Sequence, residues 1–600
     1  MIRVADYIMK RIEEQGVQHV FYVPGGQCVY LTDALRRNEN ITPVSMHHEQ
    51  AAAMAALSYS QYNGKFGACL VTTGCAGTNT MTGVLHAWQD SIPCIFVSGQ
   101  QNIEQTVAYS GLPLRQLGIQ EANIVKLVEP ITKYAVMITD AGKIAYELDK
   151  AIYMAKEGRK GPVWLDVPLN IQNAMVDEEA LERYVVEEQE LLTPSEEDNN
   201  YVSELLAHAQ RPLLIAGQGI RSANAIEDMK DFLDKTQMPV VFTRAASDYL
   251  AYDNELNIGV VVSTGGERAA NFAVQNADVI INVGCRLSTD TTGGDAADFG
   301  RNAKVIVVDI DRVEHEKDGV KIAHFVHADA KRFFECMNAQ SLQKVDKEWL
   351  NKCQHWKKRF RPYGEEAYTK APLDLCYFLE ILSKHMPQHT TLMSDAGTTG
   401  AATPTHCHLK EGDRIVHSIA QGEMGYAFPG AMGVACASDG PVVSVSGDGS
   451  FMMNLQEMQT LVRNQFNIKV FITNNNGYSG VRHGQKAHFR GKSIGTDPSN
   501  GLDLPDYKKV SEAFGVRYYR IETPAEMNEV LNSVFEDDKP CVCEVMCDPD
   551  QIVYHNGLVK YGKRKFGFRP IEDQAPFLDR DVFFEEMITE PHETSYGEPV

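Results

Sequence analysis

The sequence predicts an α/β protein built from three doubly wound domains, each around a parallel sheet. Apolar, β-branched runs alternate with helical patterns along almost the whole chain, which is typical of parallel sheets. Two stretches interrupt this alternation, the acidic segment 176–200 and the charged segment 341–373. We therefore expect domains at 1–175, 201–340 and 374–555, joined by these two linkers and followed by a tail at 556–600.

Composition and charge exclude several classes of partner. A net charge of −23 over 600 residues argues against nucleic acids and anionic membranes as partners. No apolar run is long enough to span a bilayer, and the N-terminal segment lacks the apolar core of a signal peptide. The 13 cysteines include no CxxC pair, so we expect free thiols in a reducing, cytoplasmic compartment rather than a zinc site or a disulfide framework.

The third domain carries the most informative motif. One apolar run ends in Gly-Asp-Gly-Ser and the next ends in Asn-Asn-Asn-Gly. We expect two neighbouring parallel strands, joined by a helix that begins at Phe451, with Asp448 and Asn475 together at their carboxyl ends. A carboxylate and an amide oxygen suit Mg²⁺, while glycines and the free N–H groups of a helix start suit a diphosphate.

The spacing of these two motifs resembles the diphosphate-binding motif of thiamine-diphosphate (ThDP) enzymes, although a lone Gly-Asp-Gly is also an ordinary turn. DAGTTG (395–400) and SIAQGEMGYAFPGAMG (418–433) resemble further signatures of the acetolactate synthase family, which has GGLGTMGFGLPAAIG for the second. The resemblance implies that Asp448, Asn475 and the Gly477 carbonyl bind Mg²⁺. It also implies that the Gly422 carbonyl and Met424 hold the coenzyme, with a core methionine as the alternative for Met424. Further ThDP contacts are implied for Gly397, Thr398, Thr399, Gly449, Ser450 and Tyr478.

The first domain has four segments at the ends of predicted strands: VPGG, HHEQAA, TTGCAGTN and GRKGPVWLDVPLNI. They resemble, in order and spacing, the acetolactate synthase signatures YPGG, RHEQGA, TSGPGATN and GRPGPVLVDLPKDV. The resemblance implies that Glu49 is catalytic, because the family's glutamate hydrogen-bonds the pyrimidine ring and so activates the coenzyme. A dry pocket would favour the neutral acid that this task needs. The implied ThDP contacts here are Pro24, Gly25, Thr73 and Asn79.

The middle domain has a Rossmann-type pattern, but Gly217-Gln218-Gly219 lacks a full GxGxxG. In the acetolactate synthase family this domain binds FAD that does no redox chemistry. The implied FAD positions are Arg159, Gly217, Gly219, Gly265, Gly266, Arg286, Asp309 and Asp329. The family's ARFDDRVTG stands here as CRLSTDTTG, so Asp290 replaces a second arginine. Related decarboxylases keep the fold without a flavin, and both alternatives stay open.

Residues expected in the substrate pocket depart from the family pattern. Gln27 follows the Pro-Gly-Gly turn, where the family has a small residue, whereas Gln120, implied to be catalytic and to contact substrate, is kept. Gln485 replaces an aromatic residue after the metal loop, with Arg482 close by. The tail carries a basic cluster, KYGKRKFGFR (560–569), which suits phosphate groups. A solvated loop and a basic surface patch are the alternatives. As a group, these residues predict an acceptor more polar or more anionic than pyruvate.

The sequence therefore predicts a ThDP- and Mg²⁺-dependent enzyme of the acetolactate synthase type, a carboligase acting on small molecules. It would decarboxylate a 2-keto acid, pyruvate in the family, and join the two-carbon unit to an acceptor carbonyl. The acceptor is a second 2-keto acid or a nucleotide-linked keto sugar. A decarboxylase, a C–C hydrolase and a non-catalytic regulatory subunit are further alternatives, the last opposed by intact Glu49, Asp448 and Asn475. In the family, two subunits share each site, which implies a homodimer or homotetramer.

Overall fold

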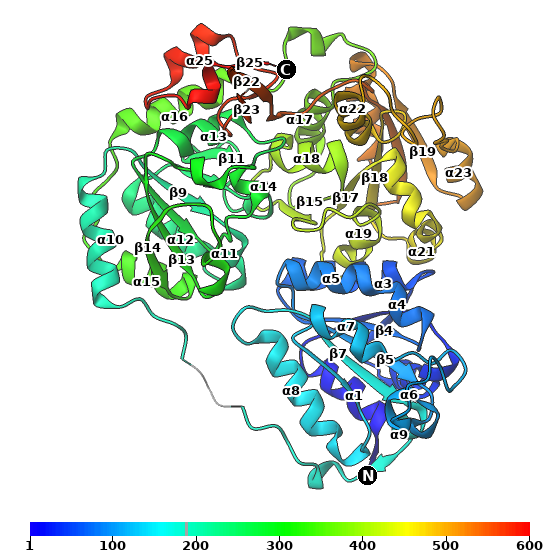
Figure 1. Cartoon of the computed structure of the whole chain (residues 1–600). Helices are drawn as coiled ribbons and strands as arrows, with labels where there is room; N and C mark the ends of the chain where they lie inside the picture. Colours follow the sequence, from blue (N-terminus) through cyan, green and yellow to red (C-terminus); the bar gives the residue numbers. More distant parts are fainter. Residues whose placement is uncertain (187–189, 564, 600) are drawn as a thin grey trace.

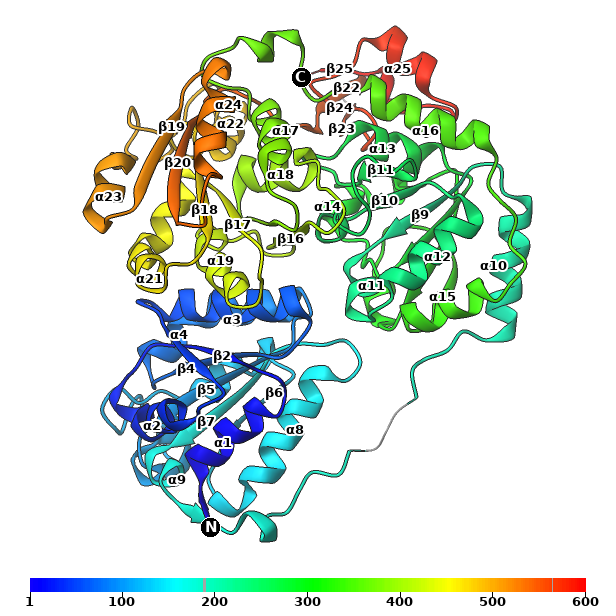
Figure 2. The same cartoon turned by 180° about the vertical axis from the view of Figure 1, so that it is seen from behind.

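The computed structural model describes residues 1–186, 190–563 and 565–599, and it contains three domains (Figure 1). Each domain is built on a six-stranded parallel sheet flanked by helices, so the predicted fold class is confirmed. The N-terminal domain packs against the C-terminal domain through α3 and α5, and the middle domain lies beside both (Figures 1 and 2).

The N-terminal sheet has the strand order β3-β2-β4-β5-β7-β6. Its strands are β2 (His19–Tyr22), β3 (Thr42–Ser45), β4 (Gly67–Val71), β5 (Cys94–Gln100), β6 (Tyr134–Met137) and β7 (Val163–Pro168). The helices include α1 (Val4–Glu13), α2 (Val29–Arg37), α3 (Glu49–Asn63), α4 (Cys75–Asn79), α5 (Met81–Gln89) and α8 (Ile144–Lys156). Strands β4, β5 and β7 are buried, as expected for a sheet with helices on both faces.

The C-terminal sheet repeats this order, β16-β15-β17-β18-β20-β19. Its strands are β15 (Thr391–Ser394), β16 (Arg414–His417), β17 (Val442–Gly447), β18 (Ile468–Asn474), β19 (Arg517–Ile521) and β20 (Cys541–Met546). The helices include α17 (Leu375–His385), α18 (Gly397–His406), α19 (Ala427–Ala435), α20 (Asp448–Phe451), α21 (Met458–Asn464), α22 (Ser479–His488), α23 (Tyr507–Phe514) and α24 (Met527–Val534). Numbered from its own first strand, each of the two sheets therefore reads 2-1-3-4-6-5.

The middle sheet has the order β11-β10-β9-β12-β13-β14, the Rossmann arrangement, with its switch point between β9 and β12. Its strands are β9 (Pro212–Ala216), β10 (Val240–Phe242), β11 (Asn257–Val260), β12 (Val279–Val283), β13 (Lys304–Asp309) and β14 (Ile322–His327). The helices include α10 (Glu196–His208), α11 (Gln218–Ser222), α12 (Ile226–Thr236), α13 (Arg268–Asn276), α14 (Thr289–Thr292), α15 (Ala330–Asn338) and α16 (Lys347–Arg359).

Helices α3 and α19 join the two outer domains through small side chains. A Cβ on Gly433 would lie only 2.0 Å from the Ala55 carbonyl oxygen, so the backbones touch at this point. The Ser58 hydroxyl donates a 2.8 Å hydrogen bond to the Tyr426 hydroxyl, and both residues are buried. One hydrophobic core therefore runs through both domains.

Three sequence-based boundaries differ from the structure. Helix α20 begins at Asp448 rather than at Phe451, directly after Gly447, which is its extended N-cap residue. Helix α10 begins at Glu196, inside the predicted first linker. The predicted second linker contains α16, whose Trp356 is buried in the core of the middle domain. The many charged residues of this segment made it look like a linker, but an amphipathic helix needs only one apolar face.

The tail belongs structurally to the middle domain, where it lies over α13 and α16 (Figure 1). Its elements are β21 (His555–Asn556), β22 (Leu558–Gly562), β23 (Lys565–Phe568), β24 (Gln574–Ala575), α25 (Arg580–Glu586) and β25 (Glu598–Pro599). Phe583 of α25 packs edge-on against Phe272 of α13 with ring centroids 5.7 Å apart. Among the described residues, no helix is long and apolar enough to cross a membrane.

Candidate active site

The structure brings Asp448 and Asn475 to the carboxyl ends of adjacent strands β17 and β18. The Asp448 carboxylate accepts the Gly477 N–H at 2.8 Å, and burial raises its pKa to about 6. The Asn475 Oδ1 is buried and has no hydrogen-bond partner among the described residues. A buried carboxylate beside an unsatisfied amide oxygen fits a hard cation.

Protein side chains alone do not complete a metal site here. In the described part of the chain, no group of three or more His, Cys, Asp or Glu side chains could hold a metal ion. A cation between Asp448 and Asn475 would therefore need backbone and non-protein oxygens, which is how Mg²⁺ binds with phosphate groups. Gly477 has φ +114°, and a Cβ there would lie 2.2 Å from the Thr496 carbonyl oxygen, so only glycine fits this loop.

Asp395, at the end of β15, was missed by sequence reasoning as a site residue. Its carboxylate accepts hydrogen bonds from the hydroxyls of Ser446 (2.9 Å) and Ser450 (2.7 Å), and Ser450 accepts the Gly425 N–H at 2.8 Å. Burial raises the pKa of Asp395 to about 6. Asp395 thus ties the Gly-Asp-Gly-Ser turn to the loop that precedes α19. The signal was present, because a carboxylate directly after a strand marks the ligand edge of such a sheet.

The loop 418–424, which contains Gly422 and Met424, is held to the N-terminal domain by charge. Its Glu423 Oε1 lies 2.6 Å from Nδ1 of His86 on α5, and the His86 Nε2 lies 3.1 Å from Asp90 Oδ2. Burial alone would lower the His86 pKa, but the charge of Glu423 and the contact with Asp90 outweigh it and raise the pKa to about 10. His86 is therefore an imidazolium between two buried carboxylates.

Further hydrogen bonds connect Asp90 and Glu423 to the backbone of the loop 418–424. The Asp90 carboxylate accepts the N–H groups of Ile419 (3.0 Å) and Ala420 (3.1 Å). Glu423 accepts the Ser418 hydroxyl, whose oxygen accepts the Gly422 N–H at 3.0 Å. Gly422 has φ +56°, so the turn favours glycine.

Glu49 lies at the first turn of α3, where its carboxylate accepts a 2.9 Å hydrogen bond from Asn79 of the same domain. The turn before it is fixed from the C-terminal domain, because the Glu457 carboxylate accepts the N–H groups of His47 and His48, both at 3.0 Å. Glu457 was also missed, since it lies 410 positions away from His47.

Gln120 is exposed and has φ +60°, an uncommon conformation for a residue with a side chain. The loop that carries it touches Gly74, where a Cβ would lie 2.0 Å from the Gln120 carbonyl oxygen. The buried Glu121 carboxylate accepts two N–H groups of the same loop, those of Val107 (3.0 Å) and Leu117 (3.2 Å). The structure thus presents the Gln120 side chain on a fixed loop.

The other predicted N-terminal residues lie on two neighbouring turns. The Thr72 hydroxyl donates to the Gln27 side-chain oxygen at 3.1 Å, and a Cβ on Gly25 would lie 2.4 Å from the Thr72 side chain. Pro24 is exposed beside them. Thr73 is buried and its hydroxyl donates to the Gln100 side-chain oxygen at 2.8 Å.

In the C-terminal domain, the hydroxyls of Thr399 and Thr473 form a 2.6 Å hydrogen bond. Gly397 and Thr398 begin α18, which follows the end of β15.

Arg482, predicted to contact the substrate, is buried in the structure and bound to backbone carbonyls. It is 4% exposed, and its guanidinium donates to three backbone carbonyls, those of Asn475 (3.1 Å), Asn476 (3.1 Å) and Pro549 (2.8 Å). It therefore holds the loop that follows β18 in place. Gln485, one turn further along α22, accepts the Ile494 N–H at 2.7 Å and is half-buried.

In the basic cluster of the tail, Arg569 is likewise buried and paired with Asp573, so it is not part of a free basic patch.

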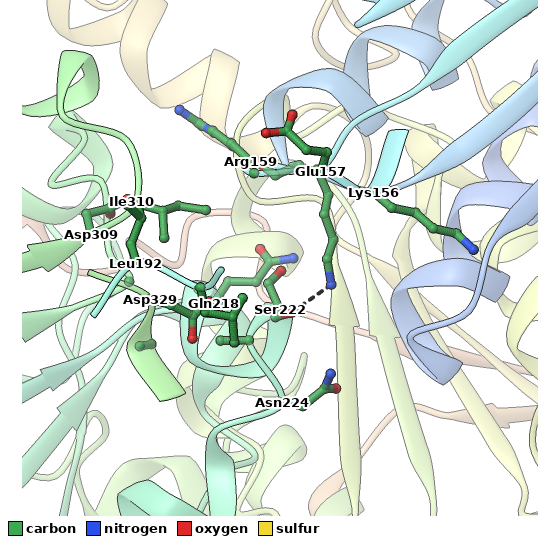
Figure 3. A pocket seen from close by; sticks show the side chains of 18 of the residues that line it. Lys156, Glu157, Arg159, Leu192, Gln218, Ser222, Asn224, Asp309, Ile310 and Asp329 are labelled. Atoms are coloured by element: carbon green, nitrogen blue, oxygen red, sulfur yellow. Dashed lines mark hydrogen bonds between the residues drawn. The ribbon is translucent and has the colours of Figure 1, made fainter. Parts of the chain in front are cut away.

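A cavity of about 1120 Å³ lies between the middle and N-terminal domains (Figure 3). In Figure 3, Asp309, Ile310 and Asp329 lie on one side, opposite Arg159 and Glu157. Five of the residues predicted to contact FAD line it, namely Arg159, Gly219, Arg286, Asp309 and Asp329. Gly217, Gly265 and Gly266 do not line it. The cavity is thus at the expected end of the middle sheet, but it contains only part of the expected set.

Comparisons with known proteins agree with this geometry. The chain matches three models of thiamine pyrophosphate enzymes: the N-terminal TPP binding domain at residues 2–127, the central domain at 200–337 and the C-terminal TPP binding domain at 395–545. It is 30% identical to the acetolactate synthase isozyme 2 large subunit of Escherichia coli, over 91% of this chain and 95% of that one. It is 30% identical to the acetolactate synthase large subunit of Corynebacterium glutamicum (98% and 93% covered) and 28% identical to the chloroplastic acetolactate synthase of Arabidopsis thaliana (90% and 81%). The chain therefore belongs to the thiamine-diphosphate enzymes of the acetolactate synthase large-subunit family.

Proposed function

We propose that this protein uses ThDP and Mg²⁺ to decarboxylate pyruvate and to join the two-carbon unit to an acceptor carbonyl. The observation that carries this proposal is the buried Oδ1 of Asn475, which has no hydrogen-bond partner among the described residues. It lies beside the Asp448 carboxylate, at the edge of the sheet where a diphosphate would lie. When bound, ThDP supplies the electron sink that lets carbon dioxide leave a 2-keto acid.

The chain's own residues bind and orient that coenzyme. Asp448, Asn475 and the Gly477 carbonyl would hold Mg²⁺ against the diphosphate, and Asp395 and Arg482 fix the loops that carry them. The Gly422 carbonyl and Met424 would orient the rings. Further diphosphate contacts are proposed for Gly397, Thr398, Thr399, Gly449, Ser450 and Tyr478. Tyr478 already packs on Gly449, where a Cβ would lie 2.1 Å from its ring.

Glu49 would hold the proton shared with the pyrimidine ring, and Asn79 would orient its carboxylate through their 2.9 Å hydrogen bond. Pro24, Gly25 and Thr73 line the same edge of the N-terminal sheet. Gln27 and Gln120 are proposed to contact the substrate, because both lie on turns at that edge and Gln120 is exposed.

We further infer that two copies of the chain share each active site. In the described structure, the Glu49 carboxylate bonds only within its own domain and makes no hydrogen bond to the diphosphate loops of the same chain. Large apolar side chains are exposed next to site residues: Leu117 and Ile119 beside Gln120, and Met452 and Met453 after the Gly-Asp-Gly-Ser turn. Exposed apolar groups of this kind mark contacts with another subunit.

The residues of helix α22 bear on which acceptor carbonyl the enzyme uses. Helix α22 begins beside the metal loop and presents His483, Gln485 and Lys486, with no aromatic residue there. This favours a polar acceptor, such as a nucleotide-linked keto sugar, over a second pyruvate.

All 13 cysteines are free, which supports the proposal that the enzyme works in a reducing cytoplasm.

The function is tested by supplying labelled pyruvate with ThDP and Mg²⁺ and analysing the products by mass spectrometry. We expect labelled carbon dioxide and a two-carbon label in a carboligation product. Release of carbon dioxide with only acetaldehyde as the second product would instead identify a decarboxylase. No turnover of pyruvate, with or without a panel of carbonyl acceptors, would overturn the proposal.

A further inference from the structure

A second, smaller cavity of about 300 Å³ lies where the three domains meet, and we refer to it as the junction cavity. Its wall combines the end of α3 and the turn before β5, residues of α11 and α12 in the middle domain, and the first residue of β16. It borders the larger cavity, with which it shares Ser91, Lys160, Gln218, Ser222 and Asn224. None of the eight residues predicted to contact FAD lines it, and the structure describes all eight. The junction cavity is therefore a different site from the one that the family resemblance predicts.

The junction cavity has an excess of positive charge. Among the described residues, the charged ones that line it are Lys160, Arg221, Arg414 and Glu227. Arg221 Nη2 and Arg414 Nε donate to the same oxygen of the buried Asp248 carboxylate, Oδ2, at 2.7 and 2.9 Å. One carboxylate thus faces two guanidinium groups. The Glu227 carboxylate is mostly exposed and lies 3.1 Å from Lys230, outside the cavity, so it does not balance the remaining positive charge.

Lys160 adds a third positive charge to this wall. Its ammonium donates to the Ser222 carbonyl at 2.7 Å, the hydrogen bond drawn in Figure 3. Burial lowers the pKa of Lys160, and the charge of Asp329 opposes this only in part. Guanidinium forks and an ammonium group are the donors that bind phosphate and carboxylate groups in proteins. Since the volume is at the lower end for ligand pockets, the cavity has the size and the charge of a site for a small anion.

The wall of the junction cavity also contacts both ends of the loop 418–424, which would hold the coenzyme. The Gln61 side chain lines the cavity and donates to the His417 carbonyl at 3.4 Å, while its oxygen accepts the Tyr426 hydroxyl at 3.2 Å. His417 directly precedes this loop, and Tyr426 follows it after one glycine. Arg414 is the first residue of β16, the strand that leads into the same loop. A ligand bound against Gln61 and Arg414 would therefore act on the position of this loop.

We propose that a small metabolite with a phosphate or carboxylate group binds in the junction cavity, between Lys160, Arg221 and Arg414, and that its binding is coupled to that of ThDP through Gln61. The anion would balance the excess positive charge where the three domains meet, and so stabilise the arrangement that holds the coenzyme loop. Because coupling is reciprocal, ThDP and the anion should raise each other's affinity by the same factor. The coupling rests on the proposed coenzyme site, whereas the anion site depends on the cavity alone.

Anion binding is measured by isothermal titration calorimetry on the full-length protein saturated with ThDP and Mg²⁺, so that the diphosphate site is already occupied. Inorganic phosphate, malonate and uncharged glycerol are separate titrants at constant ionic strength. We expect phosphate or malonate to bind with a dissociation constant below about 1 mM, and glycerol not to bind. Binding of phosphate alone would identify a phosphorylated metabolite, and binding of malonate alone would identify a carboxylate.

Three variants place the anion in the junction cavity. Arg221→Gln should weaken the anion roughly fivefold or more, while Asp248 keeps Arg414 as its partner. Glu227→Gln removes the carboxylate of the wall and should strengthen binding roughly twofold at low salt, a change that a misfolded variant cannot produce. Arg286→Gln is the matched control and should leave the affinity unchanged, because Arg286 lines only the larger cavity.

ThDP titrations followed by tryptophan fluorescence, with and without the anion, test the coupling. The anion should tighten ThDP binding roughly threefold or more in the wild type. Gln61→Leu should abolish this difference while the anion still binds, because it removes the contacts with His417 and Tyr426.

The proposal is overturned when neither anion binds, when Arg221→Gln and Glu227→Gln leave binding unchanged, or when the anion does not change ThDP affinity. Decarboxylation of pyruvate is measured on the same preparations. An active enzyme that binds neither anion would refute this site alone, and a protein that binds the anion and ThDP without turnover would refute only the proposed function.

Discussion

Nδ1 of His86 lies 2.6 Å from Oε1 of Glu423, and this contact joins α5 of the N-terminal domain to the loop that would hold the coenzyme. The family signature has threonine where this chain has Glu423, so the ion pair is a feature of this sequence. Both side chains are almost fully buried, with exposures of 0% and 7%. Buried charge therefore helps to hold the loop that carries Gly422 and Met424.

We predict that His86→Gln destabilises the protein by roughly 3–5 kcal/mol, because it leaves two buried carboxylates without their cation. The His86 pKa rises from its ordinary 6.5 to about 10 on folding. The stabilisation is therefore complete below about pH 6.5 and is lost as the pH rises through about 10. Thermal melts should show the largest gap between wild type and variant at pH 6–7 and a shrinking gap toward pH 10. A gap independent of pH would contradict this; the double variant His86→Gln/Glu423→Gln should lie closer to wild type.

The second prediction concerns Glu49. Glu49→Gln should abolish turnover while ThDP affinity stays within about tenfold, because the carboxyl group acts on the coenzyme's protonation more than on its binding. Steady-state kinetics and a ThDP titration followed by tryptophan fluorescence would measure the two quantities. Asn79→Ala, which leaves the carboxylate in place, is the matched control and should retain part of the activity. Normal turnover by Glu49→Gln would remove the central assignment.

Mixed dimers test the shared site. Asp448→Ala should lose Mg²⁺ and ThDP together, since the metal bridges the protein to the diphosphate. Alone, Glu49→Gln and Asp448→Ala should both be inactive. Co-expressed in equal amounts, they should recover about a quarter of wild-type activity, because half of the dimers are mixed and each has one intact site. No recovery, or an active monomer by light scattering, would show that each chain has its own complete site.

Arg482 should act on the metal loop rather than on the substrate. Arg482→Met removes three hydrogen bonds that the guanidinium donates to backbone carbonyls, two of them to the carbonyls of Asn475 and Asn476. We expect a loss of Mg²⁺ affinity of tenfold or more and an unchanged KM for the acceptor once Mg²⁺ is saturating. A raised acceptor KM at saturating Mg²⁺ would restore the original assignment of Arg482 as a substrate contact.

The last prediction concerns the acceptor. Charge-assisted contacts are each worth roughly 1.5–3 kcal/mol, which is enough to change acceptor preference. With Gln485 in place of an aromatic residue, we expect pyruvate alone to form acetolactate slowly and a larger polar ketone to compete. The assay compares pyruvate alone with pyruvate plus nucleotide-linked 4-keto sugars. A kcat/KM of ~10⁴ M⁻¹s⁻¹ for pyruvate alone, without competition, would identify an ordinary acetolactate synthase.

The parts of the fold that local patterns encode were predictable from the sequence. Apolar runs predicted the buried strands β17 and β18, and punctuation at their ends placed Asp448 and Asn475 at one edge of the sheet. Helix α16 was not predicted, because its buried Trp349, Cys353 and Trp356 stand among polar and charged residues in the sequence. The helix can be recognised as amphipathic only once its apolar face is seen packed against the core of the middle domain.

Contacts between distant parts of the chain were out of reach of sequence reasoning. His86 and Glu423 are 337 positions apart, and neither residue is unusual in its own segment. The same holds for Arg482, whose polar neighbours in α22 suggested a pocket while its burial could not be read from one sequence. Charge predicts that a side chain needs a partner, but only the fold decides which partner it finds.

The contact between α3 and α19 also limits how the enzyme can move. With backbone against backbone at Ala55 and Gly433, and one continuous core on either side, the two outer domains have no hinge between them. Shielding of the reacting groups from water cannot then come from these domains closing on each other. It has to come from smaller parts that move over a rigid frame, and the rate of that movement can limit turnover.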